Sequence, residues 1–215
     1  MIQHDHTYRR LTINSYFDKV FYINLDRDVT RGLKMTEQFS KFGITNFERV
    51  PGKEVLALPE NLKFRNFIKR DMKYVLGGLG CRASHLECVR LAKERNYSRV
   101  MILEDDALFL EDPDSILTRN QEILNDWDVL YFGGMIEPFF RNQIVCLHAY
   151  AIQSTVFDDI LEMAEPSGME IDNFYAKILQ HMSYNNNQSG KYNVRIALPF
   201  NQIVQDKGYE SNIQR

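Results

Sequence analysis

The chain has 215 residues, of which 44% are hydrophobic and 12% aromatic, and its 26 basic and 29 acidic side chains give a formal net charge of −3. A chain of this size buries enough surface to fold without disulfides or a structural metal. Its composition excludes collagen, coiled coil and disorder as the dominant state. The small acidic surplus argues against a general nucleic-acid-binding protein, since such domains usually carry a basic surplus.

The earliest predicted elements are two strands separated by a helix. Residues 19–25 (KVFYINL) are rich in strand formers and predict a buried parallel strand, and residues 46–50 predict a second one. Between them a helical pattern runs from about Thr30 and ends at Gly43. The side chains expected to face inward from this helix are Leu33, Met35, Phe39 and Phe42. The polar stretch 53–73 allows no firm assignment.

The middle of the chain predicts a helix followed by a strand and an acidic run. Gly77, Gly78 and Gly80 are expected to precede a helix over about 82–95, and residues 99–103 (RVMIL) predict a buried strand. Further strands are expected near 127–132, 146–152 and 193–198, and helices from Ser154 to about Ala164 and from near Asp172. Alternating strands and helices favour a mixed, mostly parallel α/β sheet in a single domain over 1–215, with 1–17 as an N-terminal extension.

The cysteines and the chain's hydropathy bear on its compartment. Cys81 and Cys88 flank His85, but with Cys146 they contain no CxxC pair and match no common zinc template, so buried free thiols in a reducing compartment are the simpler interpretation. No apolar run typical of a signal peptide or of a transmembrane helix occurs in the sequence. We therefore expect a cytoplasmic protein without a membrane-spanning segment.

The strongest chemical signal is the run Glu104-Asp105-Asp106 at the end of a buried strand. Ligands of open α/β sheets bind beyond the carboxyl ends of strands, and adjacent carboxylates repel one another unless a cation offsets their charge. Carboxylate oxygens suit Mg²⁺ or Mn²⁺. The plainer alternative is a turn cap with two solvated acids, but the position after a buried strand favours a metal and phosphate site.

A glycine motif supports a competing hypothesis. Gly78, Gly80 and Ala83 fit G-x-G-x-x-A, a variant of the dinucleotide-binding fingerprint, and Glu104 lies near where a ribose-binding acid would stand. This pattern would indicate a nicotinamide-dependent oxidoreductase. However, only residues 74–76 could form the preceding strand, and the fingerprint leaves two of the three acids unexplained.

The order of several sequence blocks resembles glycosyltransferase family 25, which includes bacterial lipopolysaccharide galactosyltransferases and collagen-modifying sugar transferases. The blocks are FYINLDR with Arg31, GGLGCRASH, RVMILEDDALF, DWDVLYFGG, LHAYAI and EIDNFYA, over about residues 18–180. The resemblance implies a GT-A-like nucleotide-diphosphosugar transferase fold and an inverting, metal-dependent transfer. UDP-galactose is the commonest donor in such a family, with glucose as the second choice of sugar. The acceptor would be a hydroxyl group on a glycan, a lipid-linked sugar or a protein.

The resemblance also implies roles for individual residues. Glu104 and Asp106 are expected to bind Mn²⁺ or Mg²⁺, with Asp105 toward the ribose or sugar. Ser84 and His85 are expected to begin a helix, where free N–H groups favour an anion, although a helix cap and a packed histidine would explain them equally simply. The full set of expected donor-binding residues is Asn24, Leu25, Asp26, Arg27, Arg31, Gly80, Ser84, His85, Asp105 and His148.

An inverting displacement also needs a base that takes the proton of the acceptor hydroxyl. Asp172, with Glu170 nearby, lies at an expected helix start, a placement similar to the base of inverting GT-A enzymes. An aspartate at a helix start is also a common cap. Acceptor recognition is expected in residues 133–141 and in the C-terminal segment. A catalytically silent sugar-nucleotide-binding domain, which would keep the acidic run but lack the base, is a third hypothesis.

Overall fold

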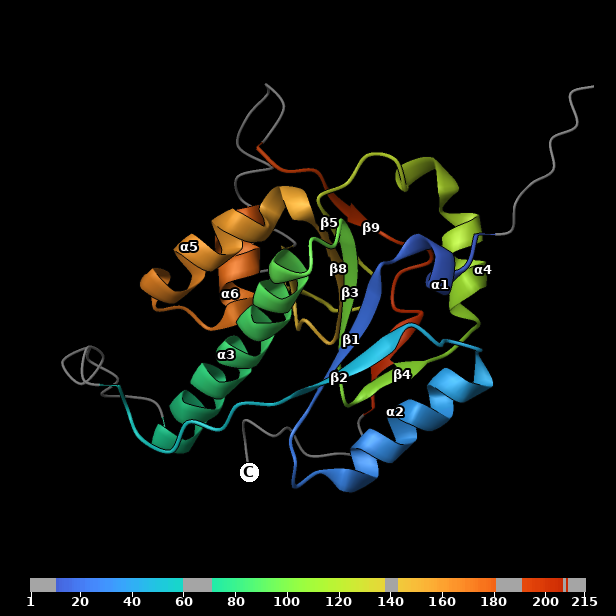
Figure 1. The fold of residues 1–215 in the computed structure, drawn as a ribbon. Coiled ribbons are helices and arrows are strands. Elements are labelled where there is room, and N and C mark those ends of the chain that lie inside the picture. The colour runs from blue at the N-terminus through green and yellow to red at the C-terminus, as the bar shows by residue number, and fades with distance from the viewer. Residues whose placement is uncertain (1–10, 60–70, 138–142, 181–190, 207, 209–215) are drawn as a thin grey trace, which may run out of the picture.

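The computed structural model describes residues 11–59, 71–137, 143–180, 191–206 and 208. A six-stranded sheet forms its centre, with the strand order β2–β1–β3–β8–β5–β9 (Figure 1). The strands are β1 Lys19–Asn24, β2 Phe47–Pro51, β3 Arg99–Glu104, β5 Val129–Tyr131, β8 Ala149–Gln153 and β9 Val194–Ile196. β1 is parallel to β2 and β3, β5 is parallel to β9, and β8 is antiparallel to both of its neighbours. The predicted mixed, mostly parallel α/β sheet is confirmed.

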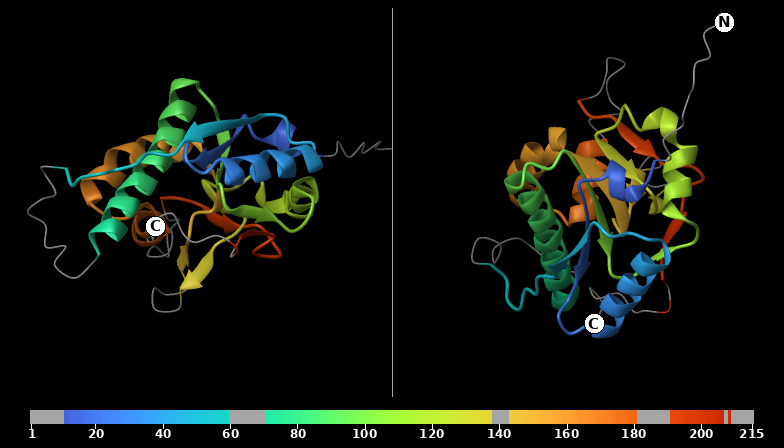
Figure 2. Two further views of the ribbon diagram at one scale, coloured as in Figure 1. Left: turned by 90° about the horizontal axis from the view of Figure 1, so that it is seen from below. Right: turned by 45° about the vertical axis from the view of Figure 1, so that its right-hand side comes forward.

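Helices cover both faces of this sheet. They are α1 Ile13–Tyr16, α2 Val29–Lys41, α3 Met72–Glu94, α4 Pro113–Arg119, α5 Phe157–Ser167 and α6 Ile171–Phe174, with 3₁₀ turns at Gln121–Ile123 and Ser154–Val156 and a π-helical segment at Tyr175–Gln180. Figures 1 and 2 show α3, α5 and α6 on one face and α1, α2 and α4 on the other. None of the helices in the described ranges is both long and apolar enough to cross a membrane.

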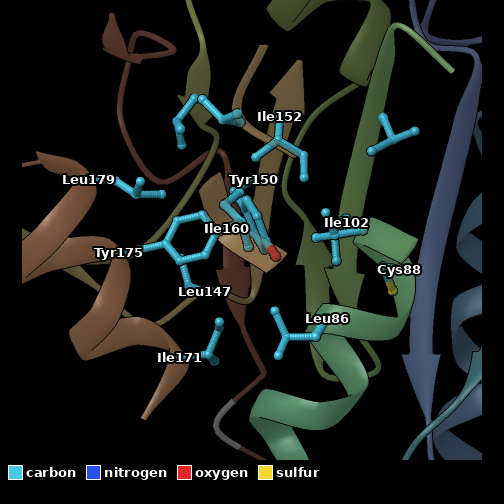
Figure 3. Close-up of a cluster of buried hydrophobic side chains, with 14 of the residues drawn as sticks. Leu86, Cys88, Ile102, Leu147, Tyr150, Ile152, Ile160, Ile171, Tyr175 and Leu179 are labelled. Atoms are coloured by element: carbon cyan, nitrogen blue, oxygen red, sulfur yellow. The ribbon is translucent and has the colours of Figure 1, made fainter. Parts of the chain in front are cut away.

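Each face of the sheet has its own hydrophobic core. Because side chains alternate along a strand, Phe21 of β1 points into one core while Val20 and Tyr22 point into the other. The first core joins the sheet to α3, α5 and α6, and Figure 3 shows Tyr150 of β8 at its centre, near Tyr175. The second core includes Ile13, Tyr16 and Phe17, so residues 13–17, assigned above to an N-terminal extension, pack against the sheet.

Two small antiparallel sheets were not expected from the sequence. β4 (Ala107–Phe109) pairs with β10 (Ile203–Gln205), and β6 (Met135–Glu137) pairs with β7 (Gln143–Val145). The first of these brings the C-terminal part of the chain back beside the residues that follow β3. Residues 138–141, part of the segment expected to recognise the acceptor, lie outside the described residues.

Two helix predictions need correction. α3 begins at Met72 rather than near Arg82, so Gly77, Gly78 and Gly80 lie inside it. The glycines permit close approach, because a Cβ at Gly80 would overlap the carbonyl oxygen of Lys53 and one at Gly78 would lie 3.2 Å from Glu170 Cγ. In α2, Leu33 does not face inward but is 59% exposed, whereas Met35 and Phe39 are fully buried.

Candidate active site

The acidic run lies at the carboxyl edge of the sheet. β1 and β3 are parallel neighbours, so Asn24 at the end of one strand lies beside Glu104 at the end of the other, and Asp105 and Asp106 follow directly. A cavity of about 470 Å³ opens at this edge. Among the residues that line it are Leu25, Arg27, Arg31, Ser84, His85, Glu104, Asp105 and Asp106, all of which were expected to bind donor or metal.

Asp105 belongs to a buried hydrogen-bond network with Asn24 and Arg31. Its Oδ2 accepts a hydrogen bond from Asn24 Nδ2 at 2.7 Å, and its Oδ1 accepts one from Arg31 Nη1 at 2.9 Å. The Arg31 and Asp105 side chains are only 4% and 6% exposed. Burial raises the pKa of Asp105, and the hydrogen bonds from Asn24 and Arg31 oppose that rise. Both carboxylate oxygens are therefore held by the protein, which makes this network a scaffold under the cavity.

The other residues of the turn after β1 are more open. Asp26 is largely exposed and forms an ion pair with Arg49, which also donates to Asn24 Oδ1 at 2.9 Å. Arg49 was missed by the sequence analysis, because a single arginine in an ordinary strand carries no signal. Arg27 forms an ion pair with Glu54 at the cavity, where Lys53 and Lys73 also line the wall. This side of the cavity therefore carries several cationic groups.

The side chains of Glu104 and His85 contact each other in the wall of the cavity. His85 Nε2 lies 3.2 Å from Glu104 Oε1, and its Nδ1 lies 2.8 Å from the Tyr150 hydroxyl. Burial alone would raise the pKa of Glu104, but the hydrogen bond and charge of His85, together with His148 and Arg31, lower it. Cys81 Sγ lies 3.9 Å from the same Glu104 oxygen.

Ser84 and His85 do not begin a helix, which corrects the sequence prediction. They lie in the middle of α3, so their backbone N–H groups serve the helix itself and offer no site for an anion. Ser84 Oγ instead accepts from Lys53 N at 2.8 Å and donates to the Gly80 carbonyl at 2.7 Å. Ser84 thus ties the segment after β2 to α3, where that segment lines the cavity.

Asp106 contrasts with Asp105 because only one of its two oxygens accepts a hydrogen bond from the described residues. Its Oδ2 accepts from Gln205 Nε2 of β10 at 3.0 Å, while the buried Oδ1 has no hydrogen-bond partner among the described residues. Burial, followed by the charges of Glu104 and Asp105, raises the pKa of Asp106 to about 7. An isolated buried oxygen of this kind is rare in folded proteins.

His148 presents a second buried atom of this kind. Its carbonyl oxygen accepts from the Glu104 backbone N–H at 3.0 Å, which places the two residues side by side. Its Nε2 lies 3.0 Å from the Ile203 carbonyl, so Nε2 carries the proton and Nδ1 presents a lone pair, for which no partner exists in the described part of the chain. Burial lowers the pKa of His148 and favours this neutral form. Gly133 lets β10 approach, because a Cβ there would overlap the Ile203 carbonyl.

Asp172 lies in the first turn of α6, but it is not the cap that the alternative interpretation required. The helix begins at Ile171, and Glu170 occupies the N-cap position. Asp172 Oδ1 accepts from the Asn173 backbone N–H at 2.8 Å. Burial raises the pKa of the Cys81 thiol, and the charges of Glu104, Asp172, Asp106 and Glu170 add to this in that order. The charge of Asp172 therefore contributes to the raised pKa of Cys81, a residue that lines the cavity.

The dinucleotide fingerprint has no structural basis. Gly78 and Gly80 lie inside α3, whereas the fingerprint requires a strand, a glycine turn and then the start of a helix. Among the described residues the strand before α3 is β2, which ends at Pro51, 21 positions before Met72 in the printed sequence. The interpretation of these glycines as a cofactor cradle was wrong.

Comparison with known proteins places the chain in a family. Residues 17–210 match the family described as "Glycosyltransferase family 25 (LPS biosynthesis protein)". A "Glycosyltransferase 25 family member" of Anopheles gambiae is 30% identical over 130 residues, which are 53% of this chain and 21% of that protein. The chain thus spans about a fifth of the length of this curated relative.

A solved structure is also similar over most of the chain. It is a glycosyltransferase involved in the glycosylation of the major capsid of PBCV-1, with a TM-score of 0.46 and 10% identity, covering 91% of this chain and 95% of that one. The family match over most of the sequence, together with the observed sheet, confirms the predicted GT-A-like class. The chain belongs to glycosyltransferase family 25.

Proposed function

We propose that this chain transfers a hexose, galactose first and glucose second, from a UDP-sugar to a hydroxyl group of a glycan, lipopolysaccharide or protein acceptor, with inversion. The observation that carries the proposal is that two buried acceptor atoms, Asp106 Oδ1 and His148 Nδ1, have no partner among the described residues. Asp106 follows Glu104 by two residues, and the His148 carbonyl accepts from the Glu104 backbone N–H. Asp106 and Glu104 line a cavity of about 470 Å³, a size within the range of about 300–1,000 Å³ common to small-molecule sites.

The residues at this edge fit a hard divalent cation, Mn²⁺ or Mg²⁺. Carboxylate oxygens are the preferred ligands of these ions, and a neutral imidazole is a frequent additional one. We assign Glu104, Asp106 and His148 as the ligands, since Asp106 and His148 each keep a buried acceptor atom that no described residue uses. A bound cation of this kind acts as a Lewis acid that offsets the charge developing on the departing diphosphate.

Other cavity residues suit the rest of a UDP-sugar. Lys53, Lys73 and Arg27 supply positive charge for the diphosphate, and the apolar side chains of Leu25 and Val55 offer a surface for the uracil ring. This end of the site rests on a hydrogen-bonded network in which Asn24 and Arg31 both donate to Asp105. We propose that they position the turn after β1 against the nucleotide.

We propose Asp172 as the base that takes the proton of the acceptor hydroxyl as that oxygen attacks the anomeric carbon. Burial raises the pKa of Cys81, which lines the cavity, and the charges of Glu104, Asp172 and Asp106 raise it further, which supports a position of Asp172 near the same site. Glu170, whose Oε2 accepts from Asn173 Nδ2 at 2.7 Å, is the weaker candidate because of its place in the fold. Glu170 instead lines a separate cavity of about 190 Å³ between α3 and α6.

A thermal-shift panel of UDP, GDP and NAD⁺, each with Mn²⁺ and with chelator, tests the donor assignment. UDP should stabilise the protein only with Mn²⁺ or Mg²⁺ present, by about 2.7 kcal/mol when its concentration is ~100 times its Kd. Asp106→Asn should abolish this metal-dependent shift. Stabilisation by NAD⁺ without metal, and none by UDP, would contradict the proposal. Metal-dependent UDP binding without transfer to any acceptor would instead support the silent binding domain.

A further inference from the structure

Three side chains of a different chemistry converge on the wall of the same cavity. Cys81 Sγ and His85 Nε2 lie 3.9 and 3.2 Å from Glu104 Oε1, and the ligand atoms of all three residues lie within 4.8 Å of one another. A tetrahedral Zn²⁺ with bonds of about 2.0–2.3 Å holds its ligand atoms about 3.3–3.8 Å apart. Two of the three separations are therefore close to those of a zinc site before any cation binds.

The fold explains why these residues meet. Cys81 and His85 are four residues apart in α3, so they lie on the same face of the helix, one turn from each other. Glu104 reaches them from the end of β3. Cys88, which also flanks His85 in the sequence, is fully buried in the hydrophobic core (Figure 3). The sequence analysis dismissed a zinc site because it weighed the two cysteines together, whereas the fold pairs only Cys81 with His85.

The surroundings prepare His85 to act as a ligand. In the cation-free protein the Nε2 proton of His85 is donated to Glu104 at 3.2 Å. With a cation bound, the tautomer that carries the proton on Nδ1 donates to the Tyr150 hydroxyl at 2.8 Å and leaves the Nε2 lone pair for the cation. Metal-bound histidines typically have such a partner on the second ring nitrogen. All three residues line the cavity of about 470 Å³, so a cation reaches them from solvent and a fourth position stays open.

We propose that Cys81, His85 and Glu104 form a binding site for a thiophilic divalent cation, foremost Zn²⁺, which binds as the Cys81 thiol releases its proton to solvent. Thiolate and imidazole ligands favour Zn²⁺ over Mg²⁺ and Mn²⁺. Because the site shares Glu104 with the ligands assigned to Mn²⁺, Zn²⁺ bound there competes with metal-dependent binding of the donor. The competition rests on the proposed function, whereas the binding of Zn²⁺ does not.

The test uses the full, untagged chain and Zn²⁺ itself, titrated against a chromogenic chelator, with Co²⁺ as a spectroscopic probe. The wild type should bind one Zn²⁺ and give a thiolate-to-cobalt charge-transfer band. Cys81→Ser should lose the band and weaken Zn²⁺ binding by more than the ~10–100-fold that loss of an outer-shell partner costs, and Tyr150→Phe should weaken it by about that outer-shell amount. Cys146 is a second thiol whose pKa is raised by nearby acidic charges, but it lies outside the cluster. Cys146→Ser should therefore leave both readouts unchanged.

Circular dichroism and melting in chelator check that each variant folds, and His85→Gln replaces Cys81→Ser where the latter does not. Equal Zn²⁺ affinity in Cys81→Ser and wild type, or an equal loss in Cys146→Ser, overturns the site. Asp106→Asn separates the two proposals, since it should lose metal-dependent UDP binding yet retain its Zn²⁺ affinity. A wild type that binds Zn²⁺ but never UDP contradicts only the proposed function. One that binds UDP with Mn²⁺ but no Zn²⁺ contradicts only this site.

Discussion

Asp105 and Asp106 are adjacent and both 6% exposed, yet their surroundings differ sharply. Asp105 faces β1 and α2, where Asn24 and Arg31 satisfy both of its oxygens. Asp106 faces β10, where Gln205 satisfies one oxygen and the other has no partner in the described ranges. The same functional group thus has both oxygens bonded in one position and one oxygen without a partner among the described residues in the next.

The difference shows how to separate support from function in a cluster of acids. Burying a carboxylate costs free energy unless hydrogen bonds or charges compensate it. At Asp105 the protein supplies the compensation through Asn24 and Arg31, so each carboxylate oxygen already has a partner. At Asp106 the compensation is incomplete, which leaves a position that a cation would complete. Substitutions of the two carboxylates are therefore expected to have different effects.

The largest effect is expected at Asp172, the proposed base. Burial, followed by the charges of Asp172, Glu104 and Asp106, raises the pKa of Cys146 to about 11. Asp172→Asn removes the proton acceptor while preserving shape, so transfer, measured as UDP release with acceptor, should fall by ~10²–10⁴-fold. UDP binding with Mn²⁺ should remain near normal, because the base meets the acceptor rather than the diphosphate.

Glu170→Gln is the matched control for Asp172→Asn. Glu170 lies two residues away and already accepts a hydrogen bond from Asn173 Nδ2. Its replacement should therefore reduce transfer far less than that of Asp172. A wild-type rate in Asp172→Asn together with a large loss in Glu170→Gln would exchange the two assignments.

The next effect concerns stability and compares the two neighbours directly. Asp105→Asn leaves the Arg31 charge buried without its main partner, so the free energy of unfolding in urea should fall by about 3 kcal/mol. Asp106→Asn removes one of three crowded negative charges, so the metal-free protein should be as stable as wild type or more so at pH 7. Equal losses of unfolding free energy in the two variants would show that the two carboxylates contribute equally to stability.

The pH dependence of the metal-free protein sharpens the same contrast. Because burial raises the folded-state pKa of Asp106 to about 7, the protonated form stabilises the fold. That stability is fully present below about pH 4, the pKa of an unfolded aspartate, and is lost as the pH rises through 7. Relative to Asp106→Asn, wild type should lose on the order of 2 kcal/mol between pH 4 and 8.

Urea melts of both proteins with chelator across this range measure the loss, and added Mn²⁺ should restore stability to wild type alone. A difference between wild type and Asp106→Asn that stays constant with pH would show that Asp106 does not titrate in this range.

Much of this architecture could be predicted from the sequence. β1, α2 and β3 follow directly from apolar runs and helical spacing, because local pattern and burial agree there. The acidic run at the end of β3 indicated the site for the same reason. The start of α3 could not be predicted, because its glycines resemble a turn and their use in close packing depends on Lys53 and Glu170, which are distant in sequence.

The finer features of the site depend on contacts that no local pattern encodes. The run of three consecutive acids gave no reason to expect different surroundings for Asp105 and Asp106. The difference arises from Arg31 on one side and β10 on the other. β10 itself is only three residues long, Ile203–Gln205, and its role comes from pairing with β4 nearly a hundred residues earlier. Non-local pairing of this kind is visible only in the fold.

The smallest expected effect concerns Ser84, for which the sequence implied donor contact and the structure offers a supporting role. Its hydroxyl bonds to Lys53 N and to the Gly80 carbonyl, so Ser84→Ala should cost about 1 kcal/mol in unfolding free energy. UDP affinity with Mn²⁺, measured by calorimetry, should fall only a few-fold, because the segment carrying Lys53 loosens but its side chains remain.

Gly80→Ala displaces the same segment by steric overlap with the Lys53 carbonyl and serves as the stronger comparison. It should destabilise by ~1–3 kcal/mol and weaken UDP binding more than Ser84→Ala does. A direct donor contact by Ser84 predicts the reverse pattern for Ser84→Ala, in which affinity falls sharply while stability is unchanged. Measuring both quantities on both variants therefore decides whether this hydroxyl holds the segment or the nucleotide.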